Sequence, residues 1–400
     1  MRKWVLNALI AVKLHGEYSN LYLRKHLKTC NPKDRNLATR IFYGTIQNWS
    51  YCESCWRTYA KGKVNDKIAV LLTMSTYQLL FLDKVPAYAI INDAVNLAGG
   101  IQPRSKGFVN AILHKVKPLE DEKDPIAFQT SCPSWIVKMW TKQYGKEKAK
   151  TIAQSSCQIL PVTIRYNPLR IDEETLWQNE NIKKPDIYIG HDIASDPLYT
   201  SGKISVQDRG SFAIAQFMDV QASDVVLDCC SAPGTKAMAM AEMMKDEGRI
   251  DCIDIHAHRV QLIQQDAKRL DLSCIHAQVG DATKLDGLGL YTKILCDVPC
   301  SGYGVLARKP DIKLHMQPSD MDTLIPLQAQ ILDCASSHVT KGGILVYSTC
   351  TLNKKENEKQ VENFLRSHSE FTLLSQKTIF PDSVHDGFFM AKMQKLENLV

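Results

Sequence analysis

Two cysteines, Cys300 and Cys350, each follow a run of apolar residues, in the segments KILCDVPCSGYG and GGILVYSTCTLN. Asp297 stands three residues before Cys300. A thiolate is a good nucleophile, and a nearby carboxyl group can stabilise charge that develops on a reacting ring. Free cysteines are also common in protein cores, but a Pro-Cys-Ser-Gly turn and a strand end are poor places for a core residue. We therefore take Cys350, Cys300 and Asp297 as candidate catalytic residues.

Zinc is a poor interpretation of these two cysteines, because no second CxxC pair and no histidine pair accompanies them. Cys52 and Cys55 do form a CxxC, but this pair falls in a segment that we predict to be helical and has no further ligands nearby in the sequence. We interpret Cys52 and Cys55 as structural, and we expect no metal site.

Three further polar segments follow predicted strands and are candidates for binding a cofactor. The loop CCSAPGTK, residues 229–236, contains Gly234, which would let the backbone approach a ligand at the start of the next helix. Asp254 lies 20 residues beyond Gly234, a spacing that suits an acid holding ribose hydroxyls. Asp281, in VGDA, could accept a hydrogen bond from an adenine amino group.

Each of these aspartates alone could be a surface residue at the end of a strand. Three such positions in register favour a nucleoside cofactor, because ligands of doubly wound sheets bind at the carboxyl ends of the strands. The sequence has neither a P-loop nor the GxGxxG fingerprint. A nucleoside without a triphosphate indicates S-adenosyl-L-methionine.

A methyl donor beside two thiols and a carboxyl group has a chemical rationale. C5 of cytosine is too weak a nucleophile to attack a sulfonium methyl group, but addition of a thiolate to C6 turns C5 into an enamine-like carbon that can attack. The thiolate must leave again after the C5 proton has been removed. The target base must first leave its stack to be reached.

The elements that would position these residues begin at about residue 223, where apolar runs alternate with helical patterns. We expect strands in DVVLDCC, RIDCIDI, CIHAQVGDA, KILCDVPC and GGILVYSTC, separated by helices such as KAMAMAEMM and RVQLIQQDAKRL. Such alternation indicates a parallel sheet that is covered on both faces. The tail, from EFTLLS to DGFFMAKMQ, could add an antiparallel hairpin at the edge of the sheet.

The first 117 residues read as helices and carry most of the positive charge. They hold 18 Lys and Arg against 6 Asp and Glu, a balance of +12, and leave 31 basic and 37 acidic residues, a balance of −6, for the remainder. This asymmetry suggests that the first part meets a polyanion, although it could also be merely a basic, soluble domain. The proline-bounded segment PLEDEKDP, residues 118–125, is the best candidate boundary.

These motifs resemble the RNA cytosine-C5 methyltransferases, and within them the bacterial 16S rRNA methyltransferase B (RsmB) group. DVPCSGYGVLARKPDIK and YSTCTLNKKENE are similar to the two cysteine motifs of this family, and VQDRGS and LDCCSAPGTK to its entry into the cofactor loop. RNLATRIFYGTIQN, VPAYAIINDAVNLA and GFVNAIL are similar to the NusB-like helical domain of this group. The resemblance covers essentially the whole chain.

The resemblance implies three parts: an all-α NusB-like RNA-binding domain at 1–122, a small connecting α/β region at 123–222, and an α/β Rossmann-like class I methyltransferase domain at 223–400. It implies that Cys350 attacks C6 and that Cys300 assists breakdown of the covalent adduct. We expect the cofactor or the base to contact Asp254, Asp281, Asp297 and the loop residues Cys230, Ser231, Ala232, Pro233, Gly234, Thr235 and Lys236.

One residue departs from the family pattern. Thr235 stands where the family usually has a second glycine, and its side chain could narrow the methionine end of the pocket, so we expect weaker cofactor binding at most. We expect Lys236, Arg308 and Lys309 to meet RNA phosphates.

The implied partner is 16S rRNA, bound by phosphate contacts through the basic N-terminal domain, with no DNA and no membrane partner. We expect a monomer in the cytoplasm, where 13 cysteines would stay reduced. Alternatives are the same chemistry on tRNA or another rRNA site, a non-catalytic RNA-binding ribosome assembly factor, and a small-molecule or protein methyltransferase. The last of these would need neither two cysteines nor a basic module.

Overall fold

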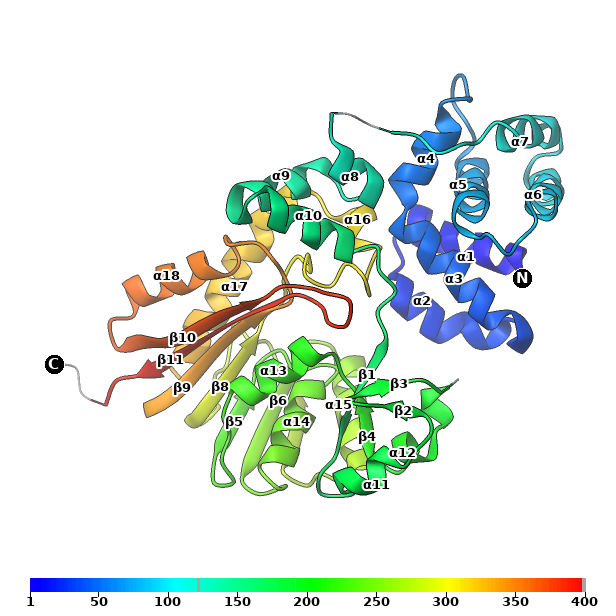
Figure 1. Cartoon of the computed structure of the whole chain (residues 1–400). Coiled ribbons are helices and arrows are strands. Elements are labelled where there is room, and N and C mark those ends of the chain that lie inside the picture. The colour runs from blue at the N-terminus through cyan, green and yellow to red at the C-terminus, as the bar shows by residue number, and fades with distance from the viewer. Residues whose placement is uncertain (121–122, 191, 398–400) are drawn as a thin grey trace. The chain divides into compact units, whose positions relative to one another are not determined.

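The computed structural model describes residues 1–120, 123–190 and 192–397, and the chain forms two compact units (Figure 1). The helical unit comprises Met1–Gln158 and Leu306–Gln317, and the sheet unit comprises Ile159–Val305 and Pro318–Val400. Two residues of the PLEDEKDP segment, 121 and 122, lie outside the described residues. The domain boundaries at 122 and 222 stay predictions.

The helical unit is built around one buried helix, α5 (Asp66–Phe81). Its side chains are buried from Ile68 almost continuously to Gln78, and it packs against α1, α3, α4, α6 and α7. A helix that is apolar on all sides is stable only when other helices surround it. The other helices are α1 (Arg2–His15), α2 (Ser19–His26), α3 (Arg35–Gln47), α4 (Trp49–Arg57), α6 (Ala87–Ile101), α7 (Lys106–Leu113), α8 (Pro125–Thr130), α9 (Ser134–Tyr144), α10 (Lys146–Ser155) and α16 (Ile312–His315).

The first helix is amphipathic: Val5, Ala8, Leu9 and Val12 recur at helical spacing and are all buried on α1. A helix stop at Gly99-Gly100 would be the usual effect of two glycines, but α6 continues through both and ends at Ile101, before the extended residue Gln102. Within the described ranges, every helix is too short or too polar to cross a membrane.

A short segment from the second half of the chain, Leu306–Gln317, packs into the helical unit. Lys313 in this segment is only 7% exposed, and its Nζ donates hydrogen bonds to the carbonyl oxygens of Thr130 (2.9 Å) and Gln47 (3.2 Å). A buried ammonium group is costly unless it is hydrogen-bonded. These backbone acceptors therefore fix the segment within the helical unit.

The sheet unit contains two sheets. The smaller sheet has the order β2-β3-β1-β4 and is antiparallel throughout. Its strands are short, and two short helices lie between them in sequence: β1 (Val162–Tyr166), α11 (Glu173–Trp177), β2 (Ile182–Lys183), β3 (Ile187–Tyr188), α12 (Pro197–Thr200) and β4 (Ile204–Val206).

The larger sheet has seven strands in the order β10-β11-β9-β8-β5-β6-β7. Strands β9, β8, β5, β6 and β7 are parallel, and β10 and β11 form an antiparallel hairpin at one edge. The strands are β5 (Val225–Asp228), β6 (Arg249–Asp254), β7 (Ile275–Val279), β8 (Tyr291–Asp297), β9 (Val339–Thr349), β10 (Phe371–Ile379) and β11 (Phe388–Lys395). The predicted parallel sheet and the antiparallel edge hairpin are both confirmed.

Helices cover both faces of this sheet (Figure 1). Three of them pack beside one another on one face, namely α13 (Arg209–Phe217), α14 (Thr235–Met243) and α15 (Ala257–Leu270). The other face carries α17 (Met321–Ser336) and α18 (Glu358–Ser367). Because the central strands are buried on both faces, they read as continuous apolar runs, such as Leu345, Val346 and Tyr347, each 0% exposed.

We predict that Lys313→Met lowers the free energy of unfolding by about 1–3 kcal/mol, because two buried carbonyl oxygens lose their donor. Urea denaturation followed by circular dichroism measures this change. Lys309→Met is the matched control, since Lys309 is exposed in the same segment, and it should change stability by less than about 0.5 kcal/mol. Equal stability of both variants would contradict a structural role for Lys313.

Candidate active site

The two candidate cysteines meet at one edge of the large sheet. Cys300 follows β8 and Cys350 follows β9, and these strands are parallel neighbours with Asp297 paired to Ser348. Parallel strands end at the same edge of a sheet, so both loops leave the sheet together. The Cys300 and Cys350 sulfurs are 3.3 Å apart and both residues are half-buried. All thirteen cysteines fall within the described residues, and each is a free thiol.

A buried carboxylate, Glu356, joins the two cysteine loops. Its oxygens accept hydrogen bonds from Ser301 N (2.9 Å) and Ser301 Oγ (2.6 Å) on the Cys300 loop. They also accept from Asn353 Nδ2 (2.9 Å) on the Cys350 loop and from Gln328 Nε2 (3.0 Å) on α17. The Ser301 and Thr351 hydroxyls lie 2.6 Å apart. Each cysteine is therefore followed by a residue that is bonded across to the other loop.

Gly304 allows a third loop to approach the cysteines. Its N–H donates to the carbonyl oxygen of Cys350 (3.0 Å), and its own carbonyl accepts from Gly387 N (2.7 Å). A Cβ at position 304 would lie 2.1 Å from the Gly387 carbonyl oxygen. Any side chain at this position would thus force the loops apart.

Asp297 lies beside the cysteines and is held in place by two neighbours. Its Oδ2 forms an ion pair with Lys236 Nζ (2.7 Å), and its Oδ1 accepts from Ser348 Oγ (2.8 Å). Burial lowers the pKa of Lys236, but the charge and hydrogen bond of Asp297 act in the opposite direction and leave the pKa of Lys236 raised overall. Lys236 therefore stays charged beside Asp297.

Asp228, at the end of β5, is 1% exposed and lies near this ion pair. Burial and the negative charge of Asp297 raise the pKa of Asp228 to about 7. Its Oδ1 and the hydroxyl of Ser231 are buried without a hydrogen-bond partner among the described residues. Such orphaned atoms are uncommon, and they indicate a place where a ligand donates or accepts a hydrogen bond.

The environment of Cys300 favours its protonated form. Its contact with the Cys350 sulfur, its burial and the nearby Glu356 all raise the pKa of Cys300 well above the usual range. A protonated Cys300 can donate its S–H toward Cys350. This favours Cys350 over Cys300 as the thiol that reacts.

The predicted cofactor residues gather at the adjoining strand ends. Cys230, Asp254 and Asp281 line one small cavity of about 110 Å³, together with Arg259. The loop from Ser231 leads into α14 through Gly234, whose φ of +100° is a conformation that other residues rarely adopt. Hydrogen bonds from the Thr283 hydroxyl and N–H lower the pKa of Asp281, so its carboxylate is ionised and can accept.

Arg259 is a residue of this region that sequence reasoning missed. Its Nη1 pairs with Asp254 Oδ2 at 3.2 Å, and its Nη2 donates to the Ala232 carbonyl oxygen at 2.8 Å. It thus ties the cofactor loop to the end of β6. The sequence feature that could have indicated Arg259 was its position near the start of the helix that follows Asp254. Glu356 was missed as well, although it stands in the ENE stretch of the second cysteine motif.

The predicted RNA-binding residues Arg308 and Lys309 fall in Leu306–Gln317, the segment that packs with the helical unit. The structure brings Cys300, Cys350, Asp297 and Lys236 together within the sheet unit, and it places Arg308 and Lys309 outside that unit. Thr235 begins α14, and its carbonyl oxygen accepts from Arg165 Nη1 at 3.2 Å. The roles predicted for Arg308, Lys309 and Thr235 stay predictions.

Comparison with known proteins identifies the parts of the chain. Residues 215–394 match the 16S rRNA methyltransferase RsmB/F family, residues 1–118 match the NusB family, and residues 132–180 match an RsmF/B-like ferredoxin-like domain. The probable ribosomal RNA small subunit methyltransferase B of Bacillus subtilis is 33% identical, over 99% of this chain and 98% of that protein.

Solved structures share the fold. The crystal structure of PH0851 has a TM-score of 0.83 at 22% identity and covers 98% of each chain. The structure of NSun6 from Pyrococcus horikoshii with SFG has a TM-score of 0.60 at 19% identity and covers 66% of this chain and 99% of that chain.

The fold and the site together define an RNA methyltransferase with a NusB-type helical domain and a Rossmann-like catalytic domain. Within that class, the chain belongs to the ribosomal RNA small subunit methyltransferase B family. The predicted fold class and the resemblance seen in the cysteine motifs are both confirmed.

We predict that D228N makes stability less dependent on pH. The folded pKa of Asp228, about 7, exceeds the value of about 3.9 in an unfolded chain. Between these values the unfolded chain is ionised and the folded chain is not, so the wild type loses stability as pH rises from about 4 to 7.

Urea unfolding at pH 5, 6, 7 and 8 tests this prediction. The stability of D228N relative to wild type should rise with pH by up to about 1.4 kcal/mol per pH unit below pH 7 and level off above it. A constant difference between the two proteins across this range would show that Asp228 is ionised throughout.

Proposed function

We propose that this protein transfers a methyl group from S-adenosyl-L-methionine to C5 of one cytosine in 16S rRNA, through a covalent bond between Cys350 and C6. The observation that carries the proposal is the pair of thiols 3.3 Å apart at the ends of neighbouring strands, beside the Lys236–Asp297 ion pair. A methyltransferase acting on an already nucleophilic atom would have no use for such a pair.

In the first step the Cys350 thiolate adds to C6 of the flipped cytosine. A new S–C6 bond forms, and the electron pair of the C5–C6 double bond moves toward C5 and the ring nitrogen N3. Asp297, fixed by Lys236 and Ser348, would accept a hydrogen bond from the exocyclic amine, and the ammonium group of Lys236 beside it would stabilise the negative charge that develops on the ring. C5 then carries the electron pair that would accept the methyl group, while the methyl–sulfur bond of the donor would break and leave a neutral thioether.

In the second step the C5 proton leaves to a base, and its bonding electron pair restores the C5–C6 double bond. The S–C6 bond breaks and Cys350 departs as a thiolate. Because Cys300 stays protonated and lies 3.3 Å from the departing sulfur, it can donate its proton or a hydrogen bond to Cys350. Cys300 thereby assists release of the methylated base.

The residues present fit the methyl donor. Bound S-adenosyl-L-methionine supplies an electrophilic methyl group on a sulfonium sulfur. Asp254 and Asp281, which share one cavity, would hold its ribose and adenine. The loop from Cys230 to Lys236 would contact the remainder, and the orphaned Asp228 and Ser231 oxygens lie in the same region.

The helical unit would supply most of the affinity for RNA. Its first 117 residues carry a balance of +12, and phosphate contacts from Lys and Arg dominate binding to nucleic acids. We place Arg308 and Lys309 among these contacts. We further propose that the protein works as a monomer in the cytoplasm, where rRNA is modified and thiols stay reduced.

We predict that Cys350→Ala abolishes transfer of labelled methyl groups to 16S rRNA transcript, because no adduct can form. Cys300→Ala should also lose turnover but should accumulate a protein–RNA adduct that survives denaturing gel electrophoresis. Cys334→Ala is a matched control, since Cys334 is a half-buried thiol on α17. Full methyl transfer by Cys350→Ala would rule out the covalent mechanism, and label on tRNA alone would overturn the substrate.

We predict that RNA binding weakens steeply with salt. Between 50 and 200 mM salt the Kd should rise about tenfold or more, as expected for three or more phosphate contacts. In Arg308→Gln/Lys309→Gln the slope of log Kd against log salt should fall by about 0.7 for each lost contact. Filter binding measures both slopes.

Lys341→Gln is the control for charge alone, because Lys341 is exposed near the amino end of β9, away from the cysteine loops. Its slope should equal that of the wild type. A salt-independent Kd would contradict phosphate-driven binding, and an unchanged slope in the double variant would remove Arg308 and Lys309 from the interface.

A further inference from the structure

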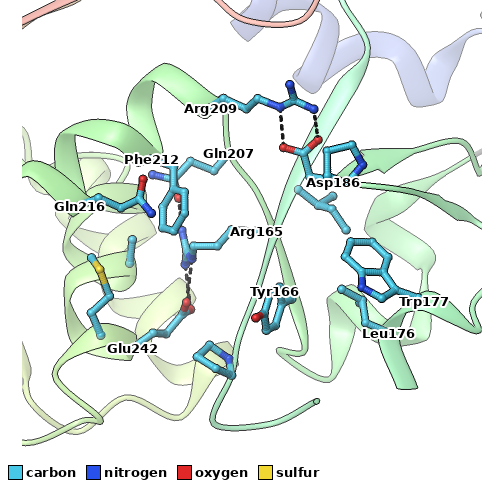
Figure 2. Close-up of a pocket in the computed structure, with 15 residues that line it drawn as sticks. Arg165, Tyr166, Leu176, Trp177, Asp186, Gln207, Arg209, Phe212, Gln216 and Glu242 are labelled. Carbon is cyan, nitrogen blue, oxygen red and sulfur yellow. Dashed lines mark hydrogen bonds and ion pairs between the residues drawn. The ribbon is translucent and has the colours of Figure 1, made fainter. Parts of the chain in front are cut away.

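A second cavity, separate from the cofactor residues, lies between the small sheet and the helices α13 and α14 (Figure 2). Its volume is about 350 Å³, at the lower end of the range of about 300–1,000 Å³ found for ligand sites. Tyr166 on β1 and Trp177 on α11 contribute to one wall, and Phe212 on α13 contributes to the other. All of these elements belong to the sheet unit.

The charges around this cavity are balanced. Arg165 donates to Glu242 through Nε (2.7 Å) and Nη2 (2.8 Å), and both side chains are almost fully buried, at 5% and 3% exposure. Arg209 Nε donates to Asp186 Oδ2 at 2.7 Å. Since each guanidinium already has a carboxylate partner, a phosphate would compete with those carboxylates. The cavity therefore suits an uncharged ligand.

The aromatic and glutamine side chains that line the cavity suit a flat heterocycle. Three aromatic rings offer faces for stacking, and base–aromatic stacking tolerates any base. Gln207 and Gln216 add carboxamide groups, which can both donate and accept hydrogen bonds at the edge of a base. A nucleobase combines these properties: it is flat, uncharged and polar at its edges.

The cavity is connected to the cysteine loops through the start of α13. Asp208 caps this helix, and its Oδ2 accepts from Asp386 N at 3.2 Å. The next residue, Gly387, donates to the Gly304 carbonyl, and Gly304 N donates to the Cys350 carbonyl. Two backbone bonds and one capping carboxylate thus link the helix that lines the cavity to the proposed nucleophile.

We propose that this cavity binds an unpaired base of the RNA substrate that neighbours the target cytosine, by stacking on Tyr166, Trp177 and Phe212. This inference rests on the proposed function. Opening the stack at the target exposes neighbouring bases, and a neutral aromatic cavity connected to the cysteine loops through α13 would hold one of them. The site would help to select the sequence or shape around the cytosine.

Two variants test the cavity by opposite means. Tyr166→Ala removes a stacking surface, and Met243→Trp fills the space, since Met243 is a half-buried lining residue. Each should raise the Kd for 16S rRNA transcript about tenfold, the size expected for one lost stacking contact. Met243→Leu, which keeps the volume, should bind like the wild type. The KM for S-adenosyl-L-methionine should not change in any of them.

Thermal unfolding checks that each variant folds. If either Tyr166→Ala or Met243→Trp does not fold, the Kd of the other variant decides the test. A Kd within twofold of the wild type in folded Tyr166→Ala and Met243→Trp would overturn the proposal. These binding measurements do not need methyl transfer. Loss of the proposed chemistry would appear instead as absence of label with RNA binding intact, so the two failures are distinguishable.

Photo-cross-linking of the wild-type protein locates the base directly. Transcript containing 4-thiouridine is irradiated in complex with the protein, and tryptic peptides are mapped by mass spectrometry. Cross-links to YNPLR, which contains Tyr166, or to IDEETLWQNENIK, which contains Trp177, would support the proposal. Absence of cross-links to both peptides would overturn the proposal in favour of an unused cavity. Cross-links that free nucleosides at millimolar concentration abolish, with RNA affinity unaffected, would overturn it in favour of a small-molecule site.

Discussion

The position of both cysteines depends on one buried carboxylate. Glu356 is 0% exposed and accepts hydrogen bonds from the Cys300 loop, the Cys350 loop and α17. If this carboxylate were removed, each buried donor left without a partner would cost about 1–3 kcal/mol. The loops come from segments 50 residues apart in the chain, and the parallel pairing of β8 and β9 brings only their starting points together. Glu356 converts that rough proximity into a fixed sulfur–sulfur distance.

The strand order explains why the other charged groups gather beside the cysteines. The chain runs from β5 outward to β6 and β7, and then returns to place β8 on the other side of β5. Ligands of such sheets bind at this reversal, where the loops on either side diverge. Asp228 and Asp297 end the two strands that flank the reversal, and Lys236 neutralises one of them. The buried carboxyl of Asp228 is tolerated close to Asp297 because it is largely protonated at a pH below about 7.

Sequence patterns predicted those parts of the structure that depend on a local property of the chain, such as the hydrophobicity of a short segment. Continuous apolar runs predicted the parallel strands, and residues at their ends predicted the group that includes Cys300, Cys350 and Asp297. The hydrogen bonds of Glu356 to both cysteine loops and those of Arg259 to the cofactor loop were not predictable, because they depend on contacts between segments far apart in sequence. The cavity beside Tyr166 was missed for the same reason, since its walls come from the small sheet and from helices α11, α13 and α14, whose packing has no local signature.

Charge counting illustrates a further limit of sequence reasoning. Of the three basic residues in ARKPDIK, Lys313 is buried against backbone carbonyls in the helical unit and cannot meet a phosphate. Lys236, Arg165 and Arg209 are likewise paired with carboxylates inside the sheet unit. The sheet unit therefore presents paired charges near the cysteines and around the aromatic cavity, while the excess positive charge lies in the first 117 residues. This distribution divides recognition between phosphates, attracted by net charge, and bases, which need neutral, shaped cavities.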